Sequence, residues 1–265
     1  MKARINDIDL AYSDEGQGTP IVFLHAFPLN RTMWTPQVDA LKERYRVITV
    51  DLRGHGESDA PMWRYTLEQF ADDVIALLQH LSITRATFAG LSMGGYVLFA
   101  LYRKYPDSVR GLIFADTRAQ ADTPDGKAAR FSMAQIAYKR GTTAIADLMM
   151  PKLLSPAALT IRQDLMDQLR AMIIGNQISG IVGDLMAMED RPDSTDLLPK
   201  ITCPTLVIAG ENDVASPPAE VQFISDHITG AEFACIPQAG HMSNMENPKG
   251  FTEALENFLA RIRKT

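Results

Sequence analysis

The chain has 265 residues, of which 46% are hydrophobic and 22% are charged, and it carries a formal net charge of −6. These proportions are typical of a globular protein with a sizeable core, the acidic balance offers no basic field for nucleic acid, and no apolar run approaches the length of a membrane-spanning helix. Two cysteines, Cys203 and Cys235, cannot form a disulfide framework, and the N-terminal residues show no signal-peptide pattern. We therefore expect a cytoplasmic protein with no nucleic-acid or membrane partner.

Short apolar runs of strand length alternate with helical patterns along most of the chain. Each run is rich in β-branched or aromatic residues and ends at Asp, Gly or His, which is typical of strands buried on both faces of a parallel sheet. Helical patterns follow several of them, at 96–105, at 251–262 and after Thr66, a predicted helix cap. The repeated β-then-α units predict a doubly wound, mostly parallel α/β fold. We predict six strands, at residues 20–24, 46–51, 86–90, 111–115, 205–209 and 232–236.

The alternation stops once, between residues 118 and 198, where the pattern is helical throughout. Seven of the thirteen methionines fall in this stretch. Methionine adapts to irregular apolar surfaces and also fills helical cores, and the sequence leaves both uses open. We interpret the stretch as a helical cap (118–198) inserted into a core formed by 1–117 and 199–265.

The segment Gly90-Leu91-Ser92-Met93-Gly94 matches the pattern G-x-S-x-G. It follows one predicted strand and precedes a helical run, which is the strand–turn–helix setting in which this pattern presents a nucleophile. Such a turn forces the serine into a strained backbone conformation, and the glycines remove side chains that would collide with it. Ser92 is therefore the candidate nucleophile, and the backbone N–H of Met93 is a candidate donor to an oxyanion.

A serine hydroxyl needs a base to accept its proton. Of the five histidines, only His241 follows a late strand in a loop that could return over the sheet. The base needs a carboxylate to orient it, and Asp213 stands just beyond the predicted strand 205–209. The order Ser92, Asp213, His241, with each residue beyond a strand, predicts a catalytic triad.

These features together resemble the α/β-hydrolase fold family over essentially the whole chain. The resemblance rests on the turn at Ser92, the segment 51–58 (DLRGHGES), the strand before Asp213 and the Gly240-His241 pair. Within that family the chain resembles small bacterial carboxylesterases and lactonases of the 3-oxoadipate enol-lactonase type.

The resemblance implies further site residues. It implies that the Phe27 N–H, in the loop 25–28 (HAFP), is the second oxyanion donor. Relatives usually carry glycine where this chain has Ala26, a residue that a positive φ would strain. It also leaves Asp116, directly after a strand, as an alternative triad acid. His25 is expected to brace the oxyanion loop rather than to act in catalysis.

The substrate pocket is less well defined by sequence. We expect Trp34, Arg118, Met133 and Met242 to line it, with Arg118 and Arg31 as possible partners of a substrate carboxylate. Trp34 and Trp63 can equally be packing residues. No metal-ligand spacing and no phosphate-binding glycine loop is present, so we predict no metal and no cofactor.

The sequence thus predicts a serine hydrolase of carboxylic esters and lactones that works through an acyl-enzyme on a small-molecule substrate. A methionine-rich cap favours an apolar acyl group of small to moderate size, with acylated homoserine lactones as one option. Two alternatives stay open: a cofactor-free haloperoxidase, perhydrolase or C–C hydrolase on the same triad, and a non-catalytic ligand receptor on a hydrolase scaffold. The sequence does not define the oligomeric state.

Overall fold

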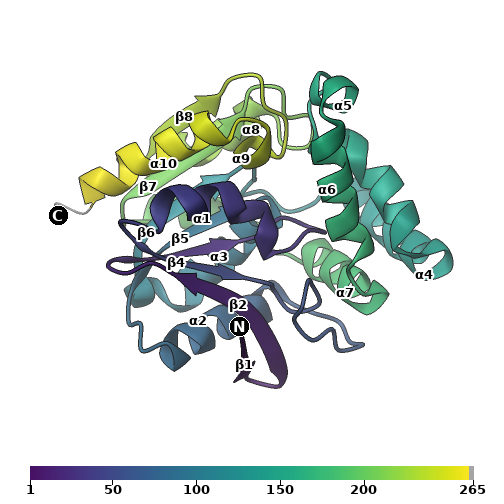
Figure 1. Cartoon of the computed structure of the whole chain (residues 1–265), viewed down its shortest axis with the longest axis horizontal. Coiled ribbons are helices and arrows are strands. Elements are labelled where there is room, and N and C mark those ends of the chain that lie inside the picture. Colours follow the sequence, from purple (N-terminus) through teal and green to yellow (C-terminus); the bar gives the residue numbers. More distant parts are fainter. Residues whose placement is uncertain (263–265) are drawn as a thin grey trace.

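A computed structural model describes residues 1–262, which form one eight-stranded sheet with helices on both faces and at one end (Figure 1). The strands are β1 (Lys2–Ile5), β2 (Ile8–Glu15), β3 (Pro20–Leu24), β4 (Arg46–Val50), β5 (Ala86–Leu91), β6 (Val109–Ala115), β7 (Thr205–Gly210) and β8 (Glu232–Ile236). The helices are α1 (Thr35–Leu41), α2 (Leu67–His80), α3 (Met93–Lys104), α4 (Pro124–Leu153), α5 (Ala158–Ile161), α6 (Gln163–Ile174), α7 (Ile178–Glu189), α8 (Pro218–Asp226), α9 (Ser243–Glu246) and α10 (Pro248–Ile262). Short 3₁₀ helices occur at Arg31–Trp34, Pro106–Ser108 and Thr195–Lys200.

The sheet has the order β1-β2-β4-β3-β5-β6-β7-β8. Strands β3 to β8 pair in parallel, as the six predicted strands require, whereas β1 and β2 pair antiparallel and were not predicted. The interior strand β5 is buried at every residue. The predicted burial on both faces is wrong for β8, most of whose residues are only half-buried, because β8 lies at the edge of the sheet.

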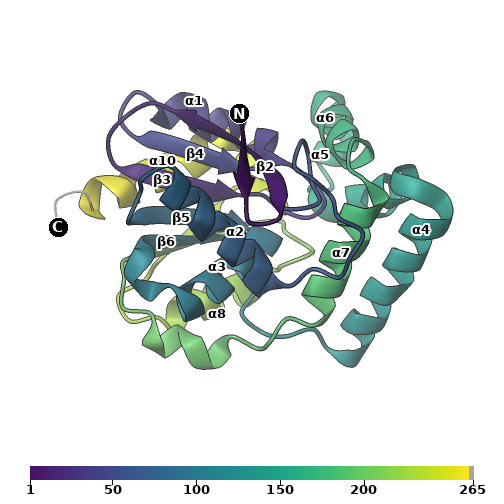
Figure 2. The same ribbon diagram turned by 90° about the horizontal axis from the view of Figure 1, so that it is seen from below.

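Helices cover both faces of the sheet, as the doubly wound prediction requires. In Figure 2, α1 and α10 lie on one side of the strands, and α2, α3 and α8 lie on the other. The predicted cap of α2 is confirmed, since the Thr66 hydroxyl accepts a hydrogen bond of 3.1 Å from the Gln69 N–H. Both layers bring apolar side chains to the strands, as in the stacked rings of Phe99 and Phe114, whose centroids lie 4.5 Å apart.

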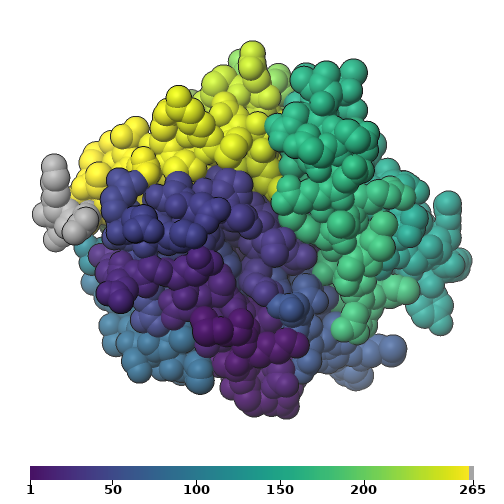
Figure 3. Space-filling model, viewed as in Figure 1, coloured from purple at the N-terminus to yellow at the C-terminus, as the bar shows by residue number. Residues whose placement is uncertain are grey.

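Helices α4 to α7 follow β6 and precede β7, and they lie together beyond one end of the sheet (Figure 1). On the face in Figure 3 this segment adjoins both the N-terminal and the C-terminal parts of the chain. Gly141, with a φ of 78°, interrupts α4. Within residues 1–262 no single helix is long and apolar enough to cross a membrane, although α6 and α7 together, bent by 94° between them, reach that length and composition.

Helix α7 is fixed to the loop that follows β4. A Cβ on Gly180 would lie 1.8 Å from the Gly54 carbonyl oxygen, so only glycine allows this backbone approach. Beside it, the buried side chains of His55 and Asp184 face each other at 3.3 Å. His55 thus brings the loop after β4 into side-chain contact with α7.

We predict that Gly180→Ala lowers the free energy of unfolding by about 2 kcal/mol or more, because two backbones must separate to admit the methyl group. Gly126→Ala is the matched control, since this glycine also lies in a helix but its nearest neighbour is the Asp122 side chain at 3.3 Å. Urea unfolding of both variants measures the difference. Equal stability of the two variants would contradict the close approach of α7.

Candidate functional site

The turn between β5 and α3 places Ser92 at the end of the sheet in a conformation that L residues rarely adopt, with a φ of 54° and a ψ of −111°. Three glycines make this turn possible. A Cβ on Gly90 or on Gly94 would lie 2.4 Å from backbone atoms, and one on Gly95 would lie 2.6 Å from the Thr117 side chain. The glycines of the motif therefore permit α3 to approach its neighbours closely enough to hold the strained serine.

Hydrogen bonds from β6 and the residues after it fix the backbone of Ser92. Its N–H donates to the Ala115 carbonyl at 2.9 Å, and the Thr117 hydroxyl donates to its carbonyl oxygen at 2.8 Å. A backbone conformation of this kind costs about 1–3 kcal/mol, so it persists only where the surrounding contacts hold it in place. These two hydrogen bonds hold the backbone of Ser92, and its side chain lies at a cavity wall.

Asp213 and His241 come together as the sequence predicts. His241 Nδ1 lies 2.8 Å from Asp213 Oδ2, and both side chains are almost fully buried. The other oxygen, Oδ1, accepts hydrogen bonds from the N–H groups of Ala215 at 2.7 Å and Ser216 at 3.0 Å. A carboxylate held in this way assigns the proton of the imidazole to Nδ1 and leaves Nε2 to accept another.

The electrostatics of His241 favour its protonated form. Burial alone would lower the pKa of this imidazole, but the charge and hydrogen bond of Asp213 outweigh burial and raise the pKa above 6.5. An ionised Asp116 carboxylate would add to this direction, and Arg118 opposes it. The imidazole is therefore a stronger base than an isolated histidine.

Asp116, the alternative acid, has different partners. Its Oδ1 accepts a hydrogen bond of 2.7 Å from the Gly210 N–H, and its Oδ2 accepts one from the Ser243 hydroxyl. His241 Nδ1 donates its hydrogen bond to Asp213 instead.

The loop after β3 carries the second candidate oxyanion donor, the Phe27 N–H. Within residues 1–262, neither the Phe27 N–H nor the Met93 N–H donates to another protein group, so both are available to a ligand. Ala26 is not among the described residues with a positive φ, so alanine is not strained there. His25 braces this loop, with Nε2 accepting from the Leu52 N–H and Nδ1 donating to the Ala26 carbonyl, each at 3.0 Å.

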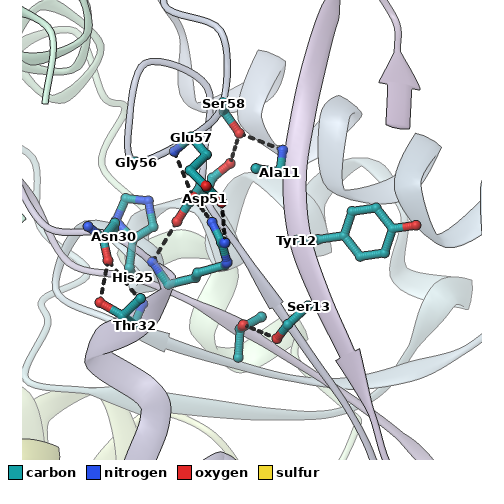
Figure 4. A network of polar contacts seen from close by, with 12 residues as sticks. Ala11, Tyr12, Ser13, His25, Asn30, Thr32, Asp51, Gly56, Glu57 and Ser58 are labelled. Carbon is teal, nitrogen blue, oxygen red and sulfur yellow. Dashed lines mark hydrogen bonds and ion pairs between the residues drawn. The ribbon is translucent and has the colours of Figure 1, made fainter. Parts of the chain in front are cut away.

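A separate polar network braces the loop after β4 (Figure 4). The Asp51 carboxylate accepts from the backbone N–H groups of Arg31 at 2.7 Å and Glu57 at 2.9 Å. The Arg31 guanidinium pairs with the carboxylates of Asp51 and Glu57. Arg31 is thus held in this network, and it is not among the residues that line the cavity beside Ser92.

A cavity of about 220 Å³ opens beside Ser92, which is smaller than the usual range of about 300–1,000 Å³ for ligand sites. The structure brings several predicted residues to its wall, namely Ser92, His241, Phe27, Arg118 and Met133.

Two predicted pocket residues lie elsewhere in the described chain. Trp34 is fully buried in the core, with its ring 4.9 Å from that of Phe23 and 5.9 Å from that of Phe251. Met242 is also fully buried, and its backbone N–H donates to the Leu153 carbonyl. A sequence pattern does not distinguish such residues from pocket residues, because both are large and apolar.

Charged residues that the sequence analysis missed line the same cavity. Arg130, Lys152 and Asp122 join Arg118 at its wall. Burial alone would raise the pKa of Asp122, but Arg130 and Arg191 lower it below its usual value, so this carboxylate is ionised between two cations. Lys152 forms no ion pair within residues 1–262. The cavity wall therefore has an excess of positive charge in a chain whose net charge is negative.

Glu246 was also missed. Its Oε1 accepts hydrogen bonds from the N–H groups of Gly240 at 2.9 Å and Ser155 at 3.2 Å, and so ties the histidine loop to the segment after α4. The sequence gives no indication of this role for Glu246, five residues after His241, because a carboxylate in a loop is usually exposed to solvent. Among residues 1–262, no cluster of three or more His, Cys, Asp or Glu side chains could hold a metal ion.

Comparisons with known proteins agree with this geometry. Residues 19–248 match the α/β hydrolase fold family. The 3-oxoadipate enol-lactonase 2 of Acinetobacter baylyi is 32% identical over 97% of this chain and 95% of its own. A malate-bound thermophilic esterase from Thermogutta terrifontis has a TM-score of 0.96, 39% identity and 99% coverage of both chains.

An enol-lactonase from Burkholderia xenovorans is similar as well, with a TM-score of 0.92, 31% identity and coverage of 98% of this chain and 100% of its own. The predicted fold and the predicted resemblance are thereby confirmed. The chain belongs to the α/β hydrolase fold family and is similar to an esterase and to enol-lactonases.

Proposed function

We propose that this chain hydrolyses carboxylic esters and lactones through an acyl-enzyme formed on Ser92. One observation carries the proposal: Ser92 and His241 line the same cavity, while Asp213 binds the far side of the His241 ring. In this arrangement the imidazole accepts the serine proton as the hydroxyl attacks the acyl carbon. The esterase and enol-lactonase relatives support this class of reaction.

The two candidate backbone donors fit the next requirement of the reaction. As the carbonyl carbon becomes tetrahedral, its oxygen gains negative charge, and the N–H groups of Phe27 and Met93 stabilise that charge. His241 then donates its proton to the leaving alcohol and later activates a water molecule that releases the acid. With a lactone the alcohol stays attached to the acyl chain.

The charged cavity wall favours a substrate that carries an anionic group. Arg118 bonds to the Ala215 carbonyl and pairs with Glu220, and Arg130 pairs with Asp122, but the Lys152 ammonium has no ion-pair partner among residues 1–262. A carboxylate on the acyl or alcohol part of the substrate would match this charge better than the wholly apolar group expected from the methionines. The malate bound to the similar esterase is itself a small dicarboxylate.

The helices that bring Met133, Lys152 and Leu185 to the cavity act in this proposal as a cap over the site. The cap spans 118–198, and the two parts 1–117 and 199–265 form the catalytic core. This division follows the chain's path, because both ends of the helical segment connect to strands β6 and β7.

Ser92→Ala should lower kcat for p-nitrophenyl butyrate on the order of 10⁴–10⁶-fold, because the nucleophile is lost. Ser132→Ala, on the exposed surface of α4, is the matched control and should keep the wild-type rate. Mass spectrometry after treatment with an alkyl phosphonate should locate the adduct on Ser92. An unchanged rate in Ser92→Ala would remove the proposed nucleophile, and tight ligand binding without turnover in the wild type would favour a receptor.

The pH profile of kcat/KM should report His241. Because the pKa of this imidazole is raised, activity should fall as the pH drops through a value above 6.5, where the base becomes protonated. Asp213→Asn should move this acid limb to lower pH and lower kcat about 10⁴-fold. Stopped-flow assays in constant-ionic-strength buffers measure both effects, and an acid limb that stays in place in Asp213→Asn contradicts the assigned pair.

Lys152→Gln tests the anionic substrate. It should raise KM for monomethyl succinate about two- to fivefold, the range of an exposed ion pair, and leave KM for methyl butyrate unchanged. Lys139→Gln removes the same charge from an exposed position of the same helix and should change neither KM. High salt should reduce the effect on the succinate ester. An equal change for both esters would mean that Lys152 has no role in charge recognition.

A further inference from the structure

Asp116 is a carboxyl group that the proposed reaction does not use, yet it lies beside the triad and is completely buried. It follows β6 directly, with a φ of 45°, a conformation that non-glycine residues rarely adopt. Its backbone N–H donates to the Ile208 carbonyl on β7 at 2.9 Å, so the strained residue is fixed from the neighbouring strand. A buried acid in a strained position calls for a structural reason.

The two oxygens of this carboxyl group bind two different loops. Oδ1 accepts from the N–H of Gly210, the last residue of β7, three residues before Asp213. Oδ2 is hydrogen-bonded to the hydroxyl of Ser243, two residues after His241. One side chain therefore connects the loop that carries the acid of the triad with the loop that carries its base.

The charged surroundings of Asp116 oppose its ionisation. From β7 and its loop it faces the Asp213 carboxylate, from the loop after β8 it faces His241, and the Cys235 thiol lies on β8 itself. Burial and the repulsion of Asp213 raise the pKa of Asp116 to about 8, and His241 offsets only part of this rise. Within residues 1–262, no Lys or Arg side chain forms an ion pair with Asp116.

We propose that Asp116 is a positioning residue that joins the Asp213 loop to the His241 loop as a neutral carboxyl group. This role rests on the proposed triad. In the neutral form Oδ1 still accepts from the Gly210 N–H and the protonated Oδ2 donates to the Ser243 hydroxyl oxygen, so both hydrogen bonds remain without a second negative charge next to Asp213. When Asp116 ionises at higher pH, the added charge favours the imidazolium that His241 becomes during the reaction, and the rate rises further.

Two substitutions separate the hydrogen bonds from the charge. Asp116→Asn has the shape of the protonated acid, since its amide oxygen can accept from Gly210 and its amide nitrogen can donate to the Ser243 hydroxyl. It should keep kcat at pH 7 within about twofold, because the neutral hydrogen bonds persist. Asp116→Ala loses both bonds and should lower kcat about ten- to a hundredfold through misplacement of the triad, with little change in KM, because Asp116 does not line the cavity.

The pH dependence of kcat/KM tests whether ionisation of the Asp116 carboxyl group affects the reaction. The wild-type protein should show a second step near pH 8, above the acid limb of His241, and Asp116→Asn should lack this step. Ser243→Ala, which keeps the carboxyl group, should retain the step. A step that persists in Asp116→Asn overturns the proposal. So does a loss of kcat in Asp116→Asn as large as that in Asp213→Asn, since Asp116 would then act as the acid of the triad.

Thermal unfolding provides a readout that does not depend on activity. The native state holds its proton up to about pH 8, whereas the unfolded chain releases it near the ordinary value of 3.8, so wild-type stability is lost as the pH rises between these values. Asp116→Asn escapes this loss, and its Tm relative to the wild type should increase from pH 5 to pH 8. If the Tm difference between Asp116→Asn and the wild type is the same at pH 5 and pH 8, the proposal that Asp116 is neutral is overturned. Because this measurement needs no substrate, it stands even if Ser92→Ala shows the proposed reaction to be wrong.

Discussion

The backbone of Ser92 is the constraint around which this site is built. Its positive φ requires that α3 start immediately after β5, and the chain accepts this only because glycine occupies each position where a Cβ would meet a neighbouring backbone or side chain. The hydrogen bonds from β6 and Thr117 then hold the turn in place. The strained backbone holds the Ser92 side chain at the cavity wall on a fixed turn between a strand and a helix, rather than on a flexible loop.

The proposed acid, Asp213, and the proposed base, His241, lie on loops that have no local reason to meet. Asp213 is ordered by two backbone N–H groups in its own loop, whereas the histidine loop is ordered by Glu246 and by its link to Ser155. Asp116 is the contact that spans the two loops. The site thus has three separate carboxyl groups with three different tasks, and their environments rather than their residue types distinguish them.

The helical segment contributes the outer wall of the cavity, and its attachment is uneven. Helix α7 is in backbone contact with the loop after β4 through Gly180, while α4 is interrupted at Gly141, where a Cβ would meet no other atom of the described chain within 4 Å. The wall that α7 provides is therefore fixed to the same loop region that carries His55, and the α4 side carries the cationic residues Arg130 and Lys152. Helix α7 thus brings the apolar side chains of Leu185 and Met188 to the wall, and α4 brings two of its cations.

The local sequence pattern predicted strands β3 to β8, helices α2, α3 and α10 and the turn at Ser92, because these depend on residues within a few positions of one another, whereas no residue range was predicted for helices α1 and α8. It also predicted the order Ser92, Asp213, His241 for the proposed triad. It did not reveal β1 and β2, which pair at the edge of the sheet, or that Trp34 lies in the core rather than in the pocket. Only the tertiary structure decided which buried groups share an environment. Asp116 forms hydrogen bonds with Gly210 and Ser243, which lie 94 and 127 positions further along the chain. Charge and burial at such a point depend on every segment that packs there.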